Sequence, residues 1–187
     1  FYGVGVYTAL ILITHLSIPM GLIILFGGIA GMLLGVLFIP MLRLDGIYFA
    51  IANFAAGYAI LIAIPHTPES ITGGALGLQV PSVYNPLGTY YAMFVLLLII
   101  VSTSMWLHRS RLGTMLMAIR DNPQAAEMSG LNRGRIRTYS WLLSALFPGL
   151  LGAVDAWNSV AFDPATAFEM RISIQAFLYV IFGGAGT

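Results

Sequence analysis

The clearest indication of the fold class is GLIILFGGIAGMLLGVLFIPML, residues 21–42. It contains no charged residue and is long enough to cross the hydrocarbon core of a bilayer, which takes about 20 mostly apolar residues in a helix. A buried helix of a soluble domain is rarely so long and so uniformly apolar. The stretch therefore predicts a membrane-spanning helix.

The rest of the chain has the same character. Of its 187 residues, 59% are hydrophobic and 8% are charged, whereas an ordinary soluble domain has about 25% charged residues. The mean hydropathy is +0.90. Prolines and polar connections divide the chain into six apolar segments: residues 1–18, 21–42, 46–64, 90–107, 139–157 and 172–187.

We therefore predict an all-α fold, a polytopic membrane helical bundle with about six spanning or partly spanning segments. Residues 1–187 form a single transmembrane domain, and we expect it to be truncated at both ends because it starts and stops inside apolar runs. The third segment has an alternative. Asn53 and the small residues around it would also suit a broken or re-entrant helix buried in the bundle.

Three glycines in the second segment recur every four residues: Gly27, Gly31 and Gly35. In a helix this spacing puts small residues on one face, so that another helix backbone can approach closely. We interpret it as a helix-packing face. The alternative is a face that lines a translocation path.

Arginines are concentrated in one connection. The chain has eight basic residues, all of them Arg, and six lie between Arg109 and Arg137. Cytoplasmic loops of membrane proteins carry an excess of Arg and Lys. We therefore place loop 108–138 in the cytoplasm, which puts Arg43 on the same side and leaves only Arg171 outside. The loops 65–89 and 158–171 are then external.

Loop 108–138 also has a helical pattern. Four apolar residues have the spacing of an amphipathic helix: Leu112, Met115, Leu116 and Ile119. RDNP then breaks this helix, and Asp121 or Asn122 can cap a second helix that has Pro123 in its first turn. We expect this short helix to run to about Ser129 and to end at Gly130 in a left-handed conformation.

The chain shows no combination of residues typical of an enzyme or a metal centre. It has no cysteine, and His15, His66 and His108 lie near different segment ends. Asp155 is the one carboxylate near a spanning segment that would suit ion or proton coupling, and it lies toward the segment's outer end. The basic loop lacks the aromatic residues typical of nucleic-acid binding. We expect no catalytic residue, no metal and no nucleic-acid partner.

A family resemblance rests on the same loop. QAAEMSG, residues 124–130, resembles the EAA loop of ABC importer permeases, with Gln124 in place of the usual Glu. The wider string SRLGTMLMAIRDNPQAAEMSGLN is similar to permeases of branched-chain amino-acid ABC importers. Four further stretches agree in order: GVGVYTAL, LRLDGIYFAI, TGGALGL and SIQAFLYVIFGGAGT. Pro148 departs from the small residue common in that family.

The resemblance implies a translocation subunit in a bacterial or archaeal plasma membrane. Its partners would be a second related permease, two cytoplasmic ATP-binding subunits and an external solute-binding protein. The chain itself would bind no cofactor, because ATP is hydrolysed on the partners. The ATPase-coupling helix would comprise Pro123, Gln124, Ala125, Ala126, Glu127 and Gly130, and the docking charges would be Arg120, Asp121, Arg133 and Arg135.

Alternatives remain at this level. Permeases of similar pattern carry urea or short amides, and nothing in these residues separates that cargo from branched-chain amino acids. A passive channel or secondary transporter would lead us to expect charges in mid-membrane or an inverted repeat, and the sequence shows neither. A purely structural membrane subunit would leave the QAAEMSG helix unexplained.

Overall fold

Six long helices make up most of the computed structural model, which describes residues 1–16, 18–44, 46–68, 72–74, 77–79, 85–158 and 161–184. They are α1 (Tyr2–His15), α2 (Met20–Leu37), α3 (Ile47–Ala63), α5 (Pro86–Arg109), α8 (Arg133–Asp155) and α10 (Met170–Phe182). Each corresponds to one of the six apolar segments of the sequence. The prediction of an all-α membrane bundle is confirmed.

Length and composition would let four helical stretches cross a bilayer within the described part of the chain. These are Met20–Leu37, Ile47–His66, Pro86–Arg109 and Pro164–Phe182. The apolar helix α1 is shorter, at 14 residues. Helix α8 has 23 residues, continues through Pro148 and starts with an Arg-rich turn.

Several segment limits differ from the expected ones. The second segment ends as a helix at Leu37 and continues as a 3-10 helix, η1 (Ile39–Arg43), because Pro40 cannot donate the backbone hydrogen bond of an α-helix. The fifth starts at Arg133, six residues before the expected 139, since Asn132 caps it through its side chain. Residues 185–187, the expected end of the sixth segment, lie outside the described residues.

The third segment is one unbroken α-helix, followed by the short 3-10 helix η2 (Ile64–His66). None of the residues of α3 is buried. A re-entrant helix would need burial in the bundle for its exposed backbone groups. The alternative of a broken, buried third segment is therefore wrong.

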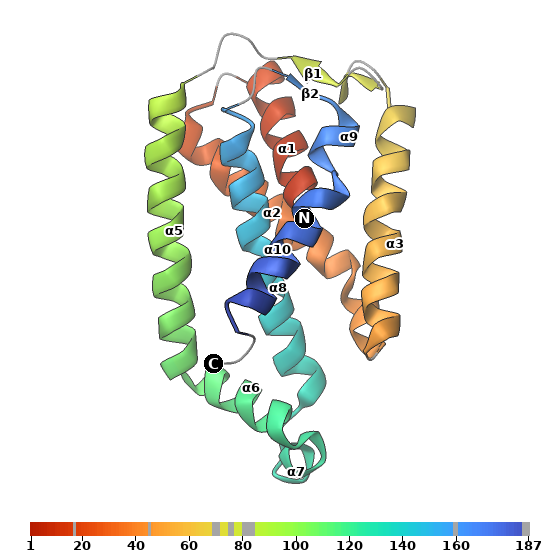
Figure 1. Ribbon diagram of the computed structural model, residues 1–187, viewed down its shortest axis with the longest axis vertical. Coiled ribbons are helices and arrows are strands. Elements are labelled where there is room, and N and C mark those ends of the chain that lie inside the picture. Colours follow the sequence, from red (N-terminus) through yellow and green to blue (C-terminus); the bar gives the residue numbers. More distant parts are fainter. Residues whose placement is uncertain are drawn as a thin grey trace.

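The two connections expected to be external meet at one end of the molecule. β1 (Leu78–Gln79) pairs in antiparallel fashion with β2 (Ala161–Phe162), and the short helix α9 (Pro164–Ala167) follows. This strand pair was not predicted, because two-residue strands leave no periodic pattern. Only parts of loops 65–89 and 158–171 are among the described residues. The pair lies at the end opposite the connection between α5 and α8 (Figure 1).

The core forms where α1, α2 and α8 pack together. Its largest fully buried side chains are Val6, Leu10, Ile23 and Val154. By contrast, α3, α5 and α10 lie toward the outside of this three-helix core, with most of their apolar side chains exposed. Exposed apolar side chains are stable in lipid, so this distribution suits a membrane protein.

Candidate functional site

The Arg-rich connection between α5 and α8 is mostly helical. Its first part is α6 (Arg111–Asp121), capped by the Ser110 side chain, which accepts a hydrogen bond from the Gly113 backbone N–H at 3.3 Å. The four apolar residues of the predicted stripe are partly buried, while Arg111 and Arg120 are exposed. The predicted amphipathic helix is confirmed. It lies across the ends of the long helices in Figure 1.

The second part is α7 (Pro123–Met128), which is fixed at both ends by local hydrogen bonds. At its start, the Asn122 side chain accepts from the Ala125 backbone N–H at 3.0 Å, and Pro123 takes the first helical position. At its end, the N–H groups of Gly130 and Leu131 donate to the carbonyls of Glu127 (2.9 Å) and Ala126 (3.1 Å).

Gly130 has φ +82°, which a glycine adopts without steric cost. This pair of bonds is the Schellman motif, which satisfies carbonyls that the last turn of a helix leaves without partners. The short helix and its left-handed end, both predicted from the sequence, are confirmed. Both ends of α7 are therefore capped, although the helix has only six residues.

Helix α7 projects from the end of the molecule, beyond α6 and the long helices (Figure 1). Ala126 is buried and faces the structure, whereas Gln124, Ala125 and Glu127 are exposed. Met128 was not among the residues predicted from the sequence. Its residue surface is 90% exposed, more than that of any other large hydrophobic residue in the described chain. The sequence does mark this residue, because Met128 is the one long apolar residue among the small and polar residues of QAAEMSG.

The four expected docking charges fall into two groups. Arg120 and Asp121 end α6 and form an ion pair at 3.3 Å, with both side chains largely exposed. An exposed pair of this kind contributes little to stability. Arg133 and Arg135 lie in the first turn of α8. The two groups therefore flank α7 in sequence, one on each side.

The glycines of α2 pack against small residues of α8. A Cβ placed on Gly27 would lie 2.4 Å from Ala153 Cβ, and one placed on Gly31 would lie 2.8 Å from the Ala145 carbonyl oxygen. A Cβ on Gly35 would lie 3.0 Å from Ala145 Cβ. The two helices thus approach as closely as their backbones allow, and this face is occupied by helix packing.

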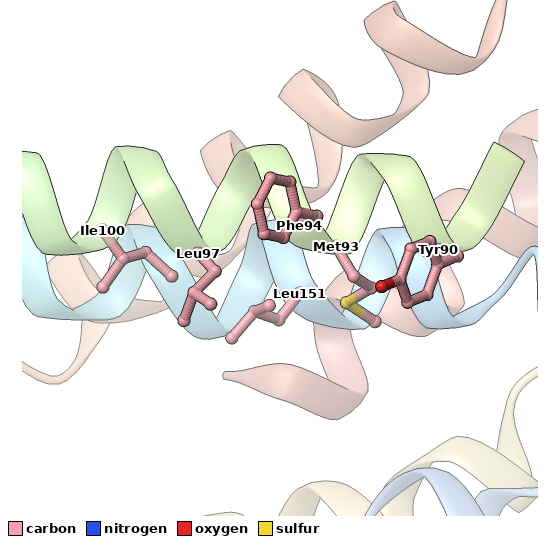
Figure 2. Close-up of a pocket in the computed structure, with 6 residues that line it drawn as sticks. All are labelled: Tyr90, Met93, Phe94, Leu97, Ile100 and Leu151. Atoms are coloured by element: carbon pink, nitrogen blue, oxygen red, sulfur yellow. The ribbon is translucent and has the colours of Figure 1, made fainter.

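A hollow of about 390 Å³ lies between α5 and α8. Figure 2 shows its six lining side chains, five from one face of α5 and Leu151 from α8; they are Tyr90, Met93, Phe94, Leu97, Ile100 and Leu151. Tyr90 and Ile100 lie at opposite ends. The other side chains of this lining are apolar, and the Tyr90 hydroxyl is its one strongly polar side-chain group.

Titratable groups are not gathered into a centre. Within the described residues, no three His, Asp or Glu side chains come close enough to hold a metal ion. Asp155, the candidate for ion coupling, accepts a short hydrogen bond from the Tyr2 hydroxyl and so joins α8 to α1. The contact therefore lies between two helices of the core.

Comparison with known proteins gives a consistent result. The family described as branched-chain amino acid transport system, permease component, matches residues 1–187. The chain is similar over its whole length, with 27% identity, to the high-affinity branched-chain amino acid transport system permease protein LivM of Escherichia coli, and equally to LivM of Salmonella typhimurium. The aligned region covers 51% of each of those proteins.

A shorter similarity involves a probable branched-chain amino acid transport permease protein, LivH, of Methanocaldococcus jannaschii. It has 29% identity over 46% of this chain and 27% of that protein. The chain therefore spans about half the length of the LivM proteins and a smaller part of LivH. No solved structure matches the chain.

Proposed function

Because the chain belongs to the family of permease components of branched-chain amino acid transport systems, we propose that it is a translocation subunit of an ATP-driven importer. In this proposal it works with a second related permease, two ATP-binding subunits and an external solute-binding protein. ATP is hydrolysed on the partners. The chain lies in the plasma membrane, with α6 and α7 in the cytoplasm.

The arrangement of α7 carries the proposal. It is a helix, capped at both ends, that projects from the bundle and presents a long apolar side chain at its tip. An exposed methionine outside the spanning helices favours a protein partner, because Met fills irregular apolar pockets well. We infer that α7 inserts into such a pocket on an ATP-binding subunit and that Met128 is its anchor.

The chain that follows α7 offers a route by which a movement of α7 could reach the helix core. Leu131 and Asn132 link α7 directly to α8, which runs into the core and packs on α1 and α2. A displacement of α7 by its partner would therefore tilt α8 relative to α2. Such a tilt can change the populations of inward-facing and outward-facing states if the partner binds them with different affinities.

Arginine placement supports the orientation. Six of the eight Arg residues lie between Arg109 and Arg137, and the connection that holds Arg43 lies toward the same end of the molecule (Figure 1). Arg171 is near the opposite connection. With α7 in the cytoplasm, seven of the eight basic residues lie on the side that such residues prefer.

For the cargo we propose branched-chain amino acids, which appear in the names of all three relatives. Urea and short amides were the alternative from the sequence, and no observation on the structure favours them. Uptake of radiolabelled leucine and urea by the full-length protein with its partners would decide between the two cargoes.

The first test concerns the partner. The full-length protein is co-purified with ATP-binding subunits of the same cell, as the native chain and as Met128→Asp, and we expect at least about a tenfold loss of binding in the variant. Met128→Leu keeps an apolar side chain and should bind normally. Gln124→Glu adds a charge on the same exposed helix, at the position where related permeases carry Glu, and controls for charge alone.

Three results are possible. Binding by the native chain and loss with Met128→Asp support both the importer and the anchor. Equal binding by the native chain and Met128→Asp would contradict the anchor but keep the importer. If the native chain binds no ATP-binding subunit, the importer proposal itself is wrong.

A further inference from the structure

Trp141 of α8 connects two helices that are far apart in sequence. Its indole N–H donates to the Gly35 carbonyl oxygen of α2 at 3.0 Å. Because α2 ends at Leu37, Gly35 belongs to the last four residues, whose carbonyls have no partner within an α-helix. Trp141 therefore caps the end of α2 and is held there by that bond.

The same indole contacts α3. The rings of Phe49 and Trp141 meet edge to face, with centroids 5.5 Å apart and an interplanar angle of 75°. On the α8 side, the Arg137 guanidinium carbon lies 5.8 Å from the centre of the Phe49 ring. Both geometries are favourable for an aromatic ring. Phe49 is thus held by two side chains that lie about one turn apart on α8.

Within the described chain, few other contacts hold helix α3. None of its residues is buried. It starts directly after Gly46, which has φ +60° and ψ −128°, a conformation that only glycine adopts readily, and a Cβ there would meet no atom within 4 Å. The α7 end of α3 is its N-terminal end, which lies nearer to α7 than the other end does (Figure 1). Gly46 directly precedes the helix there, and Phe49 follows within its first turn.

Helix α6 reaches the same place. A hollow of about 220 Å³ lies beside the contact, and Leu116 of α6 lines it together with Phe49 and Trp141; the other lining residues are Leu42, Arg137, Ser140 and Ser144. Since α6 leads directly into α7, a movement of α7 would shift Leu116 and so change the shape of the hollow beside Phe49.

We propose that Phe49 and Trp141 form a latch that holds the α7 end of α3 against α8, and that the latch opens when α6 moves. Trp141 is a positioning residue in this device: it keeps α2 in place and offers its ring to α3. Opening separates the first turn of α3 from α8 on the cytoplasmic side, and Gly46 lets the preceding connection adjust. The proposal rests on the proposed importer function, which supplies the movement of α6.

The test uses spin labels on engineered cysteines; residues 1–187 contain no cysteine, and any cysteine elsewhere in the full-length protein or its partners is replaced first. In the full-length protein with its partners, Tyr48→Cys on α3 and Tyr139→Cys on α8 carry the labels, and both residues are exposed. The distance distribution between the labels is measured by pulsed electron paramagnetic resonance. We expect a dominant short distance without nucleotide and an added longer one when ATP is bound.

Phe49→Leu is the decisive variant. It removes the ring but keeps an apolar side chain, and α3 is not part of the core, so the fold should persist. Aromatic pairs contribute enough to shift the ratio of long to short distances about two- to tenfold, even without nucleotide. Trp141→Phe keeps a ring and should shift the ratio less. Phe54→Leu, farther along α3, has no ring contact within the described chain and should leave the ratio unchanged.

An unchanged distribution in Phe49→Leu would overturn the latch. So would an ATP-loaded native complex that transports substrate while the label distance stays fixed. Failure of the native complex to show ATP-dependent uptake would contradict the importer proposal instead. The comparison of Phe49→Leu with the native chain needs no nucleotide, so it tests the latch in that case as well.

Discussion

Gly5 of α1 and Gly149 of α8 meet backbone to backbone. A methyl group on Gly5 would lie 2.2 Å from the Gly149 carbonyl oxygen, and one on Gly149 would lie 2.5 Å from the Gly27 carbonyl oxygen of α2. Three helices therefore share one point of contact from which side chains are absent. In a membrane, where helices gain no hydrophobic energy by leaving lipid, such close packing is a main source of helix association.

Gly149→Ala should destabilise the bundle, because the new methyl group must push α2 away from α8. We expect a loss of about 1–3 kcal/mol, typical of an overpacked core. The measurement is the unfolding of the purified protein in mixed micelles. Gly57→Ala is the matched control: it lies inside α3, where a Cβ meets no atom within 4 Å. Equal stability of the two variants would contradict the close contact.

Gly130→Val should disturb α7 without unfolding the bundle. The left-handed conformation at φ +82° strains a β-branched residue, at a cost of about 1–3 kcal/mol. A Cβ there meets no neighbouring atom, so the strain is confined to the backbone. We expect ATP hydrolysis by the complex to continue while uptake falls. Gly130→Asn tolerates this conformation and should stay coupled; normal uptake by the Val variant would argue against a rigid α7.

Asn122→Ala removes the side chain that caps α7. The loss of an N-cap costs about 1 kcal/mol, so the backbone amides of α7 should exchange hydrogen about fivefold faster. Hydrogen–deuterium exchange followed by mass spectrometry measures this directly. Asn122→Asp keeps an acceptor oxygen for the Ala125 N–H and should exchange like the native chain. Unchanged exchange in Asn122→Ala would show that α7 does not depend on its cap.

The variant Asp155→Asn distinguishes two possible roles of the Asp155 carboxylate: joining two helices, or coupling transport to ions. The Asn side chain still offers an oxygen to the Tyr2 hydroxyl, so stability and uptake should both be retained. Asp155→Leu removes the acceptor and leaves the partly buried hydroxyl without it, which should cost about 1–3 kcal/mol. Stability in micelles and uptake are measured for both variants. Loss of uptake in a stable Asp155→Asn protein would revive the ion-coupling alternative.

Local sequence signals were sufficient for much of the fold and of the candidate site. The six apolar segments predicted the six long helices. Asp121 or Asn122 as N-cap, with Gly130 at the other end, predicted α7 to within one residue, and the structure has Asn122 as the cap. The caps of α7 depend on residues three to five positions apart along the chain. Their hydrogen bonds form inside one turn and need no distant partner.

Other features depend on how the helices are rotated and placed, and they became visible in the three-dimensional structure. It selected α1, α2 and α8 for the core and left α3 unburied, which ruled out a re-entrant third segment. It also joined Trp141 to Gly35, which are 106 positions apart. Apolar residues surround most of these helices, so their sequence does not mark which face meets protein and which meets lipid; close backbone contact settles that in three dimensions.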